Sequence, residues 1–193
     1  MPHRGLEAAK TRLAPVLDPA EREALARTLL ARVLGVVREA CEDVVVISPS
    51  EALRPIVEEA GAQLSVQRGM GLNAGLEQAR AEAVADGVAL LGVLHGDLPN
   101  LSPDDVRALL GVVPAQGGGV AVAPDRAGTG TNGLAQSPAD AIAFRFGTDS
   151  LARHREAAAE AGLPLTVVER PGLAFDLDTP ADLARWLELG DAA

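Results

Sequence analysis

GVALLGVLHGDLP, residues 87–99, is the stretch that decides the fold class. Its apolar run is typical of a strand buried on both faces of a parallel sheet, and it is too short to span a bilayer. Gly96 and Asp97 then predict a loop at the carboxyl end of this strand. The residues from Ser102 to Asp105 have the pattern of a capping box, so we expect a helix to begin there. A strand that leads into a helix favours the α/β class.

The same alternation continues on both sides of this stretch. Upstream, the apolar patterns predict helices and strands in the order helix 22–37, strand 44–48, short helix 49–59, strand 63–66 and helix 73–85. Downstream, they predict a strand to about 124, a Gly/Thr-rich loop, a return strand 133–137, a helix 150–161, a strand 165–168 and a last helix 180–189. This order favours a mostly parallel sheet with helices on both faces.

Composition limits the possible functions. A chain of 193 residues with 48% apolar residues suits a single α/β domain over residues 1–193 and excludes a disordered chain. Aromatic residues make up only 2%, which weakens any reading as a stacking platform for single-stranded nucleic acid. The net charge of -10 disfavours nucleic acid and anionic membranes as partners.

Cysteine usage and the N-terminus indicate the compartment. Cys41 is the only cysteine, so no intramolecular disulfide can form. The first residues lack the apolar run of a signal peptide. We therefore expect a cytoplasmic protein.

Three carboxylates are the strongest candidates for chemistry. Asp176 and Asp178 alternate with apolar residues in AFDLDTPAD, so an extended backbone turns both to one face. Two adjacent carboxylates repel unless a cation lies between them, and oxygen ligands of this kind suit magnesium. Asp97, at a strand end, could supply a third. The alternative is structural: Asp97 as a turn residue, Asp178 beside a helix capped by Thr179, and Asp176 solvated.

Basic residues and small-residue loops are candidates for holding an anion. Lys10 and Arg12 form either an exposed basic turn or an anion site. The loop DRAGTGTN, residues 125–132, has small residues whose N–H groups could approach a phosphate. Gly147 gives a turn before a helix start that Ser150 could cap, and a helix N-terminus attracts anions. The charged run that follows, residues 153–155, either contributes to this site or forms a solvated helix face.

Several common sites are missing from the sequence. It contains no P-loop, no Gly-x-Gly-x-x-Gly after a strand and no Gly-x-Ser-x-Gly. One cysteine and three scattered histidines argue against a thiol nucleophile and against a zinc site.

Taken together, the segments resemble one family. AAKTRLAPVL, GLNAGLEQA, HGDLP, PDRAGTGTN, FRFGTDSLARH and PGLAFDLDTPADL, in this order, resemble the guanylyltransferases of coenzyme F420 biosynthesis that act on 2-phospho-L-lactate or phosphoenolpyruvate. The resemblance covers the chain from Leu6 to about Leu187. It implies a Rossmann-like domain of the nucleotide-diphospho-sugar transferase type. It also implies that the phosphate of a three-carbon acid attacks the α-phosphorus of GTP and releases diphosphate.

The resemblance assigns residues to the nucleotide side of this reaction. It places Lys10 and Arg12 on the GTP triphosphate, and Gly71, Leu72 and Asn73 in the loop that approaches guanine. Lys10 and Arg12 are also counted among the catalytic residues.

It assigns further residues to the metal and to the acid. Asp97, Asp176 and Asp178 match the family's metal carboxylates. The resemblance implies that they hold two magnesium ions and that Asp97 is also a catalytic residue. The residues that match the pocket for the phosphoacid lie in two segments, Thr129, Gly130 and Thr131 in the first and Gly147 and Ser150 in the second.

The N-terminus departs from the family pattern. Members begin with an apolar strand before the basic loop, whereas this chain begins MPHRGLEAAK. We therefore expect the first strand to be missing, either because the start codon is placed too late or because a partner chain, as in a homodimer, completes the sheet. Two alternatives remain open: a nucleotidyltransferase of the same fold with another acceptor, such as a molybdopterin or a sugar phosphate, and an inactive nucleotide-binding protein.

Overall fold

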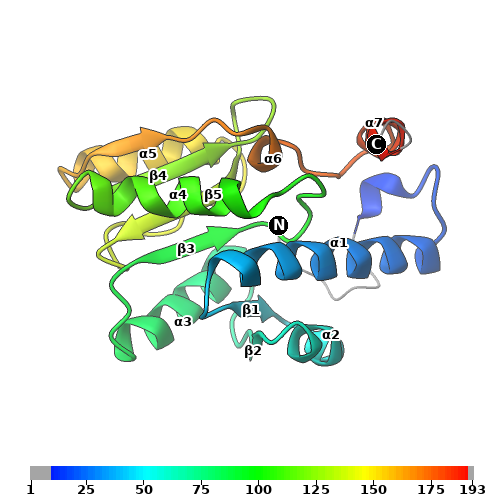
Figure 1. The fold of residues 1–193 in the computed structure, drawn as a ribbon, viewed down its shortest axis with the longest axis horizontal. Coiled ribbons are helices and arrows are strands. Elements are labelled where there is room, and N and C mark those ends of the chain that lie inside the picture. The colour runs from blue at the N-terminus through cyan, green and yellow to red at the C-terminus, as the bar shows by residue number, and fades with distance from the viewer. Residues whose placement is uncertain (1–9, 191–193) are drawn as a thin grey trace.

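The computed structural model describes residues 10–190, in which helices and strands alternate (Figure 1). The strands are β1 (Val45–Ser48), β2 (Gln63–Val66), β3 (Leu91–Leu94), β4 (Gly119–Pro124), β5 (Thr131–Ser137) and β6 (Leu165–Val167). The α-helices are α1 (Pro19–Ala40), α2 (Arg54–Glu59), α3 (Leu72–Ala85), α4 (Pro103–Ala115), α5 (Ser150–Glu160), α6 (Pro171–Ala174) and α7 (Pro180–Gly190), with 3₁₀ turns η2 (Thr11–Leu13) and η3 (Glu51–Leu53). The predicted α/β class is confirmed.

The described strands form two sheets. β1 pairs with β2 in parallel, and β3, β5, β4 and β6 form a second sheet in that order. β4 and β6 are parallel, whereas β5 runs antiparallel to both β3 and β4. The antiparallel β5 is the return strand that the sequence predicts after the Gly/Thr-rich loop.

Helices cover both faces of the larger sheet, as predicted. Along β4, Ala121 and Ala123 face a core cluster that includes α4, while Val120 and Val122 face a cluster that includes α5. This alternation follows from the period of two in a strand. Small alanines on one face let α4 approach closely, and Figure 1 shows α4 and α5 on opposite sides of β4.

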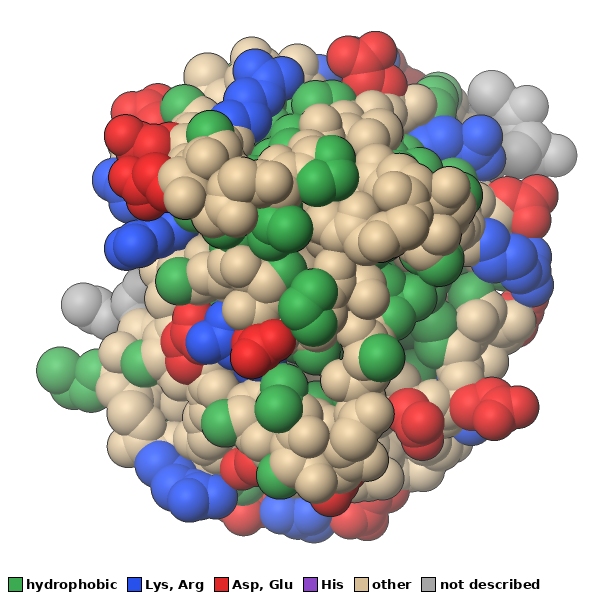
Figure 2. All heavy atoms as spheres, turned by 90° about the vertical axis from the view of Figure 1, so that its left-hand side faces the viewer, with side chains coloured by type: hydrophobic (Ala, Val, Ile, Leu, Met, Phe, Trp, Pro, Cys, Tyr) green, Lys and Arg blue, Asp and Glu red, His purple; other side chains and the backbone are tan. Residues whose placement is uncertain are grey.

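The expected absence of a first strand concerns residues 1–9, which lie outside the described part of the chain. Among residues 10–190, β1 pairs only with β2, and β3 pairs only with β5, so no ladder joins the two sheets. None of the described helices is long and apolar enough to cross a bilayer. On the face drawn in Figure 2, acidic and basic side chains are interspersed without a continuous basic area.

Candidate functional site

A buried ion-pair cluster lies at the carboxyl end of β3. Lys10 Nζ donates to Asp97 Oδ2 at 2.5 Å and to Asp178 Oδ1 at 2.7 Å. The Lys10 side chain is only 7% exposed, so its charge depends on these two partners. The fold thus brings Asp97 and Asp178, which are 87 and 168 positions from Lys10 in the sequence, into contact with its ammonium group.

The backbone and the charge of Lys10 are both unusual. Its φ of 54° and ψ of 39° place a residue with a Cβ in the left-handed region, which costs about 1–2 kcal/mol. Burial alone would lower the pKa of Lys10, but the charges of Asp97 and Asp178 outweigh it and hold the pKa above its usual value. The strained turn before η2 therefore holds a permanently charged ammonium against two carboxylates.

The alternation in AFDLDTPAD is confirmed. Phe175 and Leu177 are buried, and Leu177 packs with Leu13 of η2 and Leu29 of α1. The N–H of Leu177 donates to the Asp97 carbonyl at 3.1 Å, which ties this segment directly to the end of β3. The carboxylates on either side of Leu177 consequently meet Asp97.

Asp176 and Asp178 have different surroundings. Asp176 accepts a hydrogen bond from Asn132 of β5 at 3.4 Å. Burial, and then the nearby charges of Asp97 and Asp178, raise the pKa of Asp176 despite that bond. Asp176 therefore lies within electrostatic range of both other carboxylates.

A capping box fixes the backbone at Asp178. Asp182 Oδ2 accepts from Thr179 N at 2.9 Å and from Thr179 Oγ1 at 2.7 Å, and Asp182 N donates back to Thr179 Oγ1 at 3.3 Å. The same carboxylate accepts from Asp178 N at 3.3 Å and pairs with Arg126 at 2.6 Å. The predicted cap at Thr179 is confirmed, and it orients the residue that contacts Lys10.

The carboxylates of residues 10–190 do not form a ready-made metal cage. In this part of the chain no group of three or more acidic, histidine or cysteine side chains is arranged to hold an ion. Lys10 Nζ lies between Asp97 and Asp178, so a cation bound by that pair would require the ammonium to give up at least one contact. The donor set itself, three neighbouring carboxylates, has the chemistry that magnesium prefers.

Arg12 lies at the solvent side of the cluster. Its Nη1 atom is 3.9 Å from Asp178 Oδ2, and its side chain is 63% exposed. A guanidinium held this loosely can turn towards an anionic ligand without leaving a buried charge unpaired.

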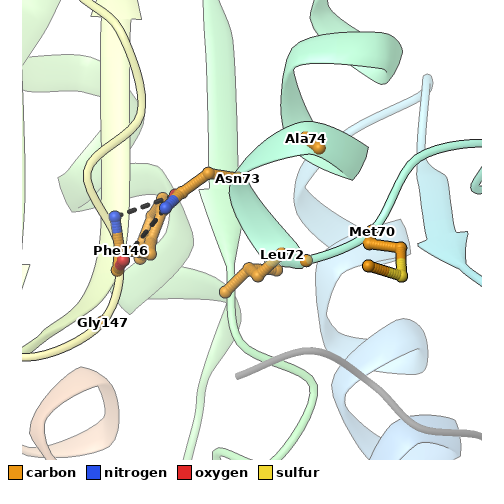
Figure 3. A pocket seen from close by; sticks show the side chains of 7 residues that line it. Met70, Leu72, Asn73, Ala74, Phe146 and Gly147 are labelled. Carbon is orange, nitrogen blue, oxygen red and sulfur yellow. Dashed lines mark hydrogen bonds between the residues drawn. The ribbon is translucent and has the colours of Figure 1, made fainter.

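A pocket of about 330 Å³ opens where α3 begins (Figure 3). Its walls come from two of the segments predicted to form a site, and its lining residues are Met70, Gly71, Leu72, Asn73, Ala74, Phe146 and Gly147. Gly71 precedes α3 with φ +92°, a conformation that L side chains rarely adopt. The loop predicted to meet guanine and the turn predicted to meet the phosphoacid share this pocket.

The side chain of Asn73 is committed to the protein. Its Nδ2 donates to the Phe146 carbonyl at 3.0 Å, and its Oδ1 accepts from Phe146 N at 2.9 Å. Figure 3 shows the Asn73 side chain reaching from α3 to the loop that contains Phe146. Both functions of the amide are used, so Asn73 joins the two walls of the pocket rather than presenting its amide to a ligand.

The two predicted phosphoacid segments also meet. Leu151 N donates to the Thr129 carbonyl at 3.1 Å, which ties the first turn of α5 to the Gly/Thr-rich loop. Thr131 and Ser150 are both buried, and Gly147 has φ +118°. The N-cap of α5 is Asp149 rather than Ser150, so the predicted capping role of Ser150 is wrong: Ser150 is the first helical residue.

The structure decides between the two alternatives for His154. It is fully buried, between exposed Arg153 and Arg155, and so does not belong to a solvated helix face. Its spacing from Leu151 and Ala158, which are also buried, matches the period of a helix. That spacing is the signal that could have identified it.

Comparison with known proteins finds relatives that match nearly the whole chain. The family model for "Guanylyl transferase CofC like" matches residues 1–192. A phosphoenolpyruvate guanylyltransferase from Rubrobacter xylanophilus is 42% identical over 96% of this chain and 90% of its own length. A 3-phospho-D-glycerate guanylyltransferase from Phenylobacterium zucineum is 38% identical over 93% of this chain and 84% of its own.

Solved structures show the same fold. A protein from Desulfovibrio desulfuricans G20, provisionally assigned as a nucleotide-diphospho-sugar transferase, superposes with a TM-score of 0.76 at 21% identity, over 95% of this chain and 81% of its own. The 2-C-methyl-D-erythritol 4-phosphate cytidylyltransferase of Thermus thermophilus gives 0.56 at 21% identity, over 84% and 89%. The resemblance read from the sequence motifs is confirmed, and the chain belongs to the CofC-like guanylyl transferase family.

Proposed function

We propose that this chain transfers GMP from GTP to the phosphate of a three-carbon phosphoacid, phosphoenolpyruvate or 2-phospho-L-lactate, in coenzyme F420 biosynthesis. A phosphate oxygen of the acid attacks the α-phosphorus of GTP, the bond from that phosphorus to the bridging oxygen breaks, and diphosphate leaves. The observation that carries the proposal is the Lys10 side chain held between Asp97 and Asp178. Phosphoryl-type transfer needs charge neutralisation and positioning more than a protein nucleophile.

Lys10 and Arg12 are proposed to bind the triphosphate. Lys10 supplies an ammonium group that stays protonated at physiological pH, and Arg12 supplies an exposed guanidinium with several N–H donors. Gly71 and Leu72 are proposed to bind guanine through their backbone, with Asn73 holding that loop in place through Phe146.

The acid is proposed to bind on the opposite side of the pocket. There the backbone N–H groups and hydroxyls would hold the phosphate and the carboxylate of the acid. The residues assigned to this role are Thr129, Gly130, Thr131, Gly147 and Ser150.

We propose that Asp97, Asp176 and Asp178 hold magnesium, two ions in all. Magnesium would neutralise the developing charge and orient the phosphates. The support is the donor chemistry, together with the raised pKa of Asp176, which burial and then the charges of Asp97 and Asp178 cause. A divalent cation would relieve the repulsion between these charges. Lys10 would then keep its contact with one carboxylate or transfer it to a phosphate oxygen.

The test is diphosphate release from the purified chain with GTP and magnesium. Phosphoenolpyruvate, 2-phospho-L-lactate and 3-phosphoglycerate are compared as acceptors, with ATP and CTP replacing GTP as controls. We expect release with GTP and with phosphoenolpyruvate or 2-phospho-L-lactate. A folded chain that releases no diphosphate with any acceptor contradicts the proposal, and release only with 3-phosphoglycerate corrects the substrate. The homodimer and the cytoplasmic location stay predictions.

A further inference from the structure

His154 is a buried histidine with a hydrogen-bond partner at each ring nitrogen. It lies in the first turns of α5 with no exposed surface. Its Nδ1 atom is 3.1 Å from Thr131 Oγ1, and its Nε2 atom accepts from Arg145 N at 3.0 Å. The Phe146 ring packs edge-on against it, with the centroids 5.0 Å apart.

The partners fix the tautomer. A backbone N–H can only donate, so Nε2 must carry the lone pair. Burial, and then the charge of Arg145, lower the pKa of His154 to about 4, so the ring is neutral at pH 7. A neutral ring with its lone pair on Nε2 carries its hydrogen on Nδ1. Nδ1–H therefore donates to Thr131 Oγ1, and the hydroxyl proton of Thr131 points to a different acceptor.

The loop around His154 is held by side chains at three successive N–H groups. Phe144 N donates to Glu77 at 3.1 Å, Arg145 N to His154, and Phe146 N to Asn73 at 2.9 Å. The next residue is Gly147, which lines the pocket. His154 thus contacts both segments proposed to bind the phosphoacid, at Thr131 and at the approach to Gly147.

We propose that His154 is a positioning residue of the phosphoacid pocket, which keeps the Thr131 hydroxyl as a donor directed at an oxygen of the acid. The inference rests on the proposed function. An acid that carries a phosphate and a carboxylate offers only acceptors, so a hydroxyl that is already accepting from His154 has its proton available for this substrate. A histidine buried only for packing would not constrain that proton.

Two substitutions separate the two nitrogens. In His154→Gln the side-chain oxygen can replace Nε2 as the acceptor for Arg145 N, but the bond to Thr131 is lost. In His154→Asn the side-chain nitrogen can replace Nδ1 as the donor to Thr131, but the bond from Arg145 is lost. Arg155→Gln, exposed on the same helix, is the matched control. Each variant is first checked for a cooperative thermal transition.

The measurement is KM for the acceptor and for GTP, determined separately. We expect His154→Gln to raise the acceptor KM about ten-fold, as for loss of a hydrogen bond to a charged group, with GTP KM changed less than about two-fold. His154→Asn should change the acceptor KM less than His154→Gln does. Arg155→Gln should change neither KM.

A double-mutant cycle with Thr131→Val decides whether His154 acts through Thr131. If it does, His154→Gln adds less than about two-fold once the hydroxyl is gone. Additive effects, or equal increases in both KM values, overturn the inference and leave the proposed function intact. A wild-type chain that turns over no acceptor overturns the proposed function, and the role of His154 falls with it.

Discussion

At the scale of single residues, the sequence predicted which acids would meet but not what would lie between them. Asp97, Asp176 and Asp178 were identified from a strand end and from alternation with apolar neighbours. Lys10 Nζ contacts two of them, Asp97 and Asp178. Its position depends on a left-handed backbone conformation, which the presence of a lysine in the sequence does not predict. Asn73 lies in the predicted loop, and the sequence does not indicate its two bonds to Phe146, because these join segments 73 residues apart.

Replacing Lys10 tests the cluster. Lys10→Met removes the charge at nearly constant volume and leaves Asp97 and Asp178 facing each other partly buried, which we expect to cost about 1–3 kcal/mol of unfolding free energy. Activity should fall at least about a hundred-fold, because the triphosphate loses its buried cation. Urea unfolding and diphosphate release measure the two effects. Arg54→Met, at an exposed ion pair on α2, is the control; an equal effect there would contradict this role for Lys10.

The buried histidine predicts a pH dependence of stability. The pKa of His154 is about 4 in the folded chain, below its ordinary value of 6.5, so the unfolded chain binds more protons between these pH values. The stability contributed by neutral His154 is complete above about pH 6.5 and is lost as the pH falls towards 4. Between pH 7.5 and pH 5, wild type should lose about 2 kcal/mol more than His154→Gln, measured by urea unfolding. Parallel curves for the two proteins would contradict the neutral buried ring.

At the scale of elements, local signals were sufficient where a cap or a period is strong. The capping box that begins α4 at Ser102 is present as predicted, and β2 has the predicted bounds. The helix predicted over residues 22–37 is also present and begins with a capping box at Asp18. The short elements α6 and η2 were not predicted, because a single turn has too few residues to show a helical period of apolar residues. The predicted helical start at Ser150 is confirmed, but its cap is Asp149 with φ 53°, a left-handed conformation that aspartate adopts more readily than most residues.

Two capping boxes offer a matched pair. Asp182→Ala removes the box of α7 and also the contact with Asp178 N, while Asp18→Ala removes the exposed box of α1. Both should cost about 1 kcal/mol or more of unfolding free energy. Only Asp182→Ala should reduce diphosphate release, about ten-fold, because only it releases Asp178. Equal activity of the two variants would show that the cap does not orient the site.

At the scale of the whole molecule, the alternation of strands and helices predicted the layers, and the core between them is aliphatic. Leu98, Leu109, Leu134 and Leu177 are among its fully buried side chains. The position of β5 between β3 and β4 could not be predicted, since strand order depends on pairing between distant residues and not on local pattern. The motifs identified the family because they recur together, although none of them specifies its contacts.

Ligand binding should appear as a change in global stability. We expect GTP with magnesium to bind the folded chain and so to raise the midpoint of thermal unfolding. A ligand that binds only the folded state adds about 2.7 kcal/mol to its stability at a hundred times its Kd. Magnesium should add to the rise that GTP alone causes in the unfolding midpoint of wild type, and most of this added rise should be absent in Asp178→Asn. A magnesium-dependent shift of the same size in Asp178→Asn would contradict the assignment of Asp178 as a ligand.

Guanylyl transfer is proposed to take place at the carboxylates around Lys10. The most direct measurement is the initial rate of diphosphate release from GTP and phosphoenolpyruvate, with and without magnesium, for the wild type and for Asp178→Asn. Asp178→Asn keeps the size of the side chain and removes a charge. We expect magnesium-dependent release by wild type and a rate at least about a hundred-fold lower for a folded Asp178→Asn. Equal rates for the two proteins, or release by wild type that does not depend on magnesium, would contradict it.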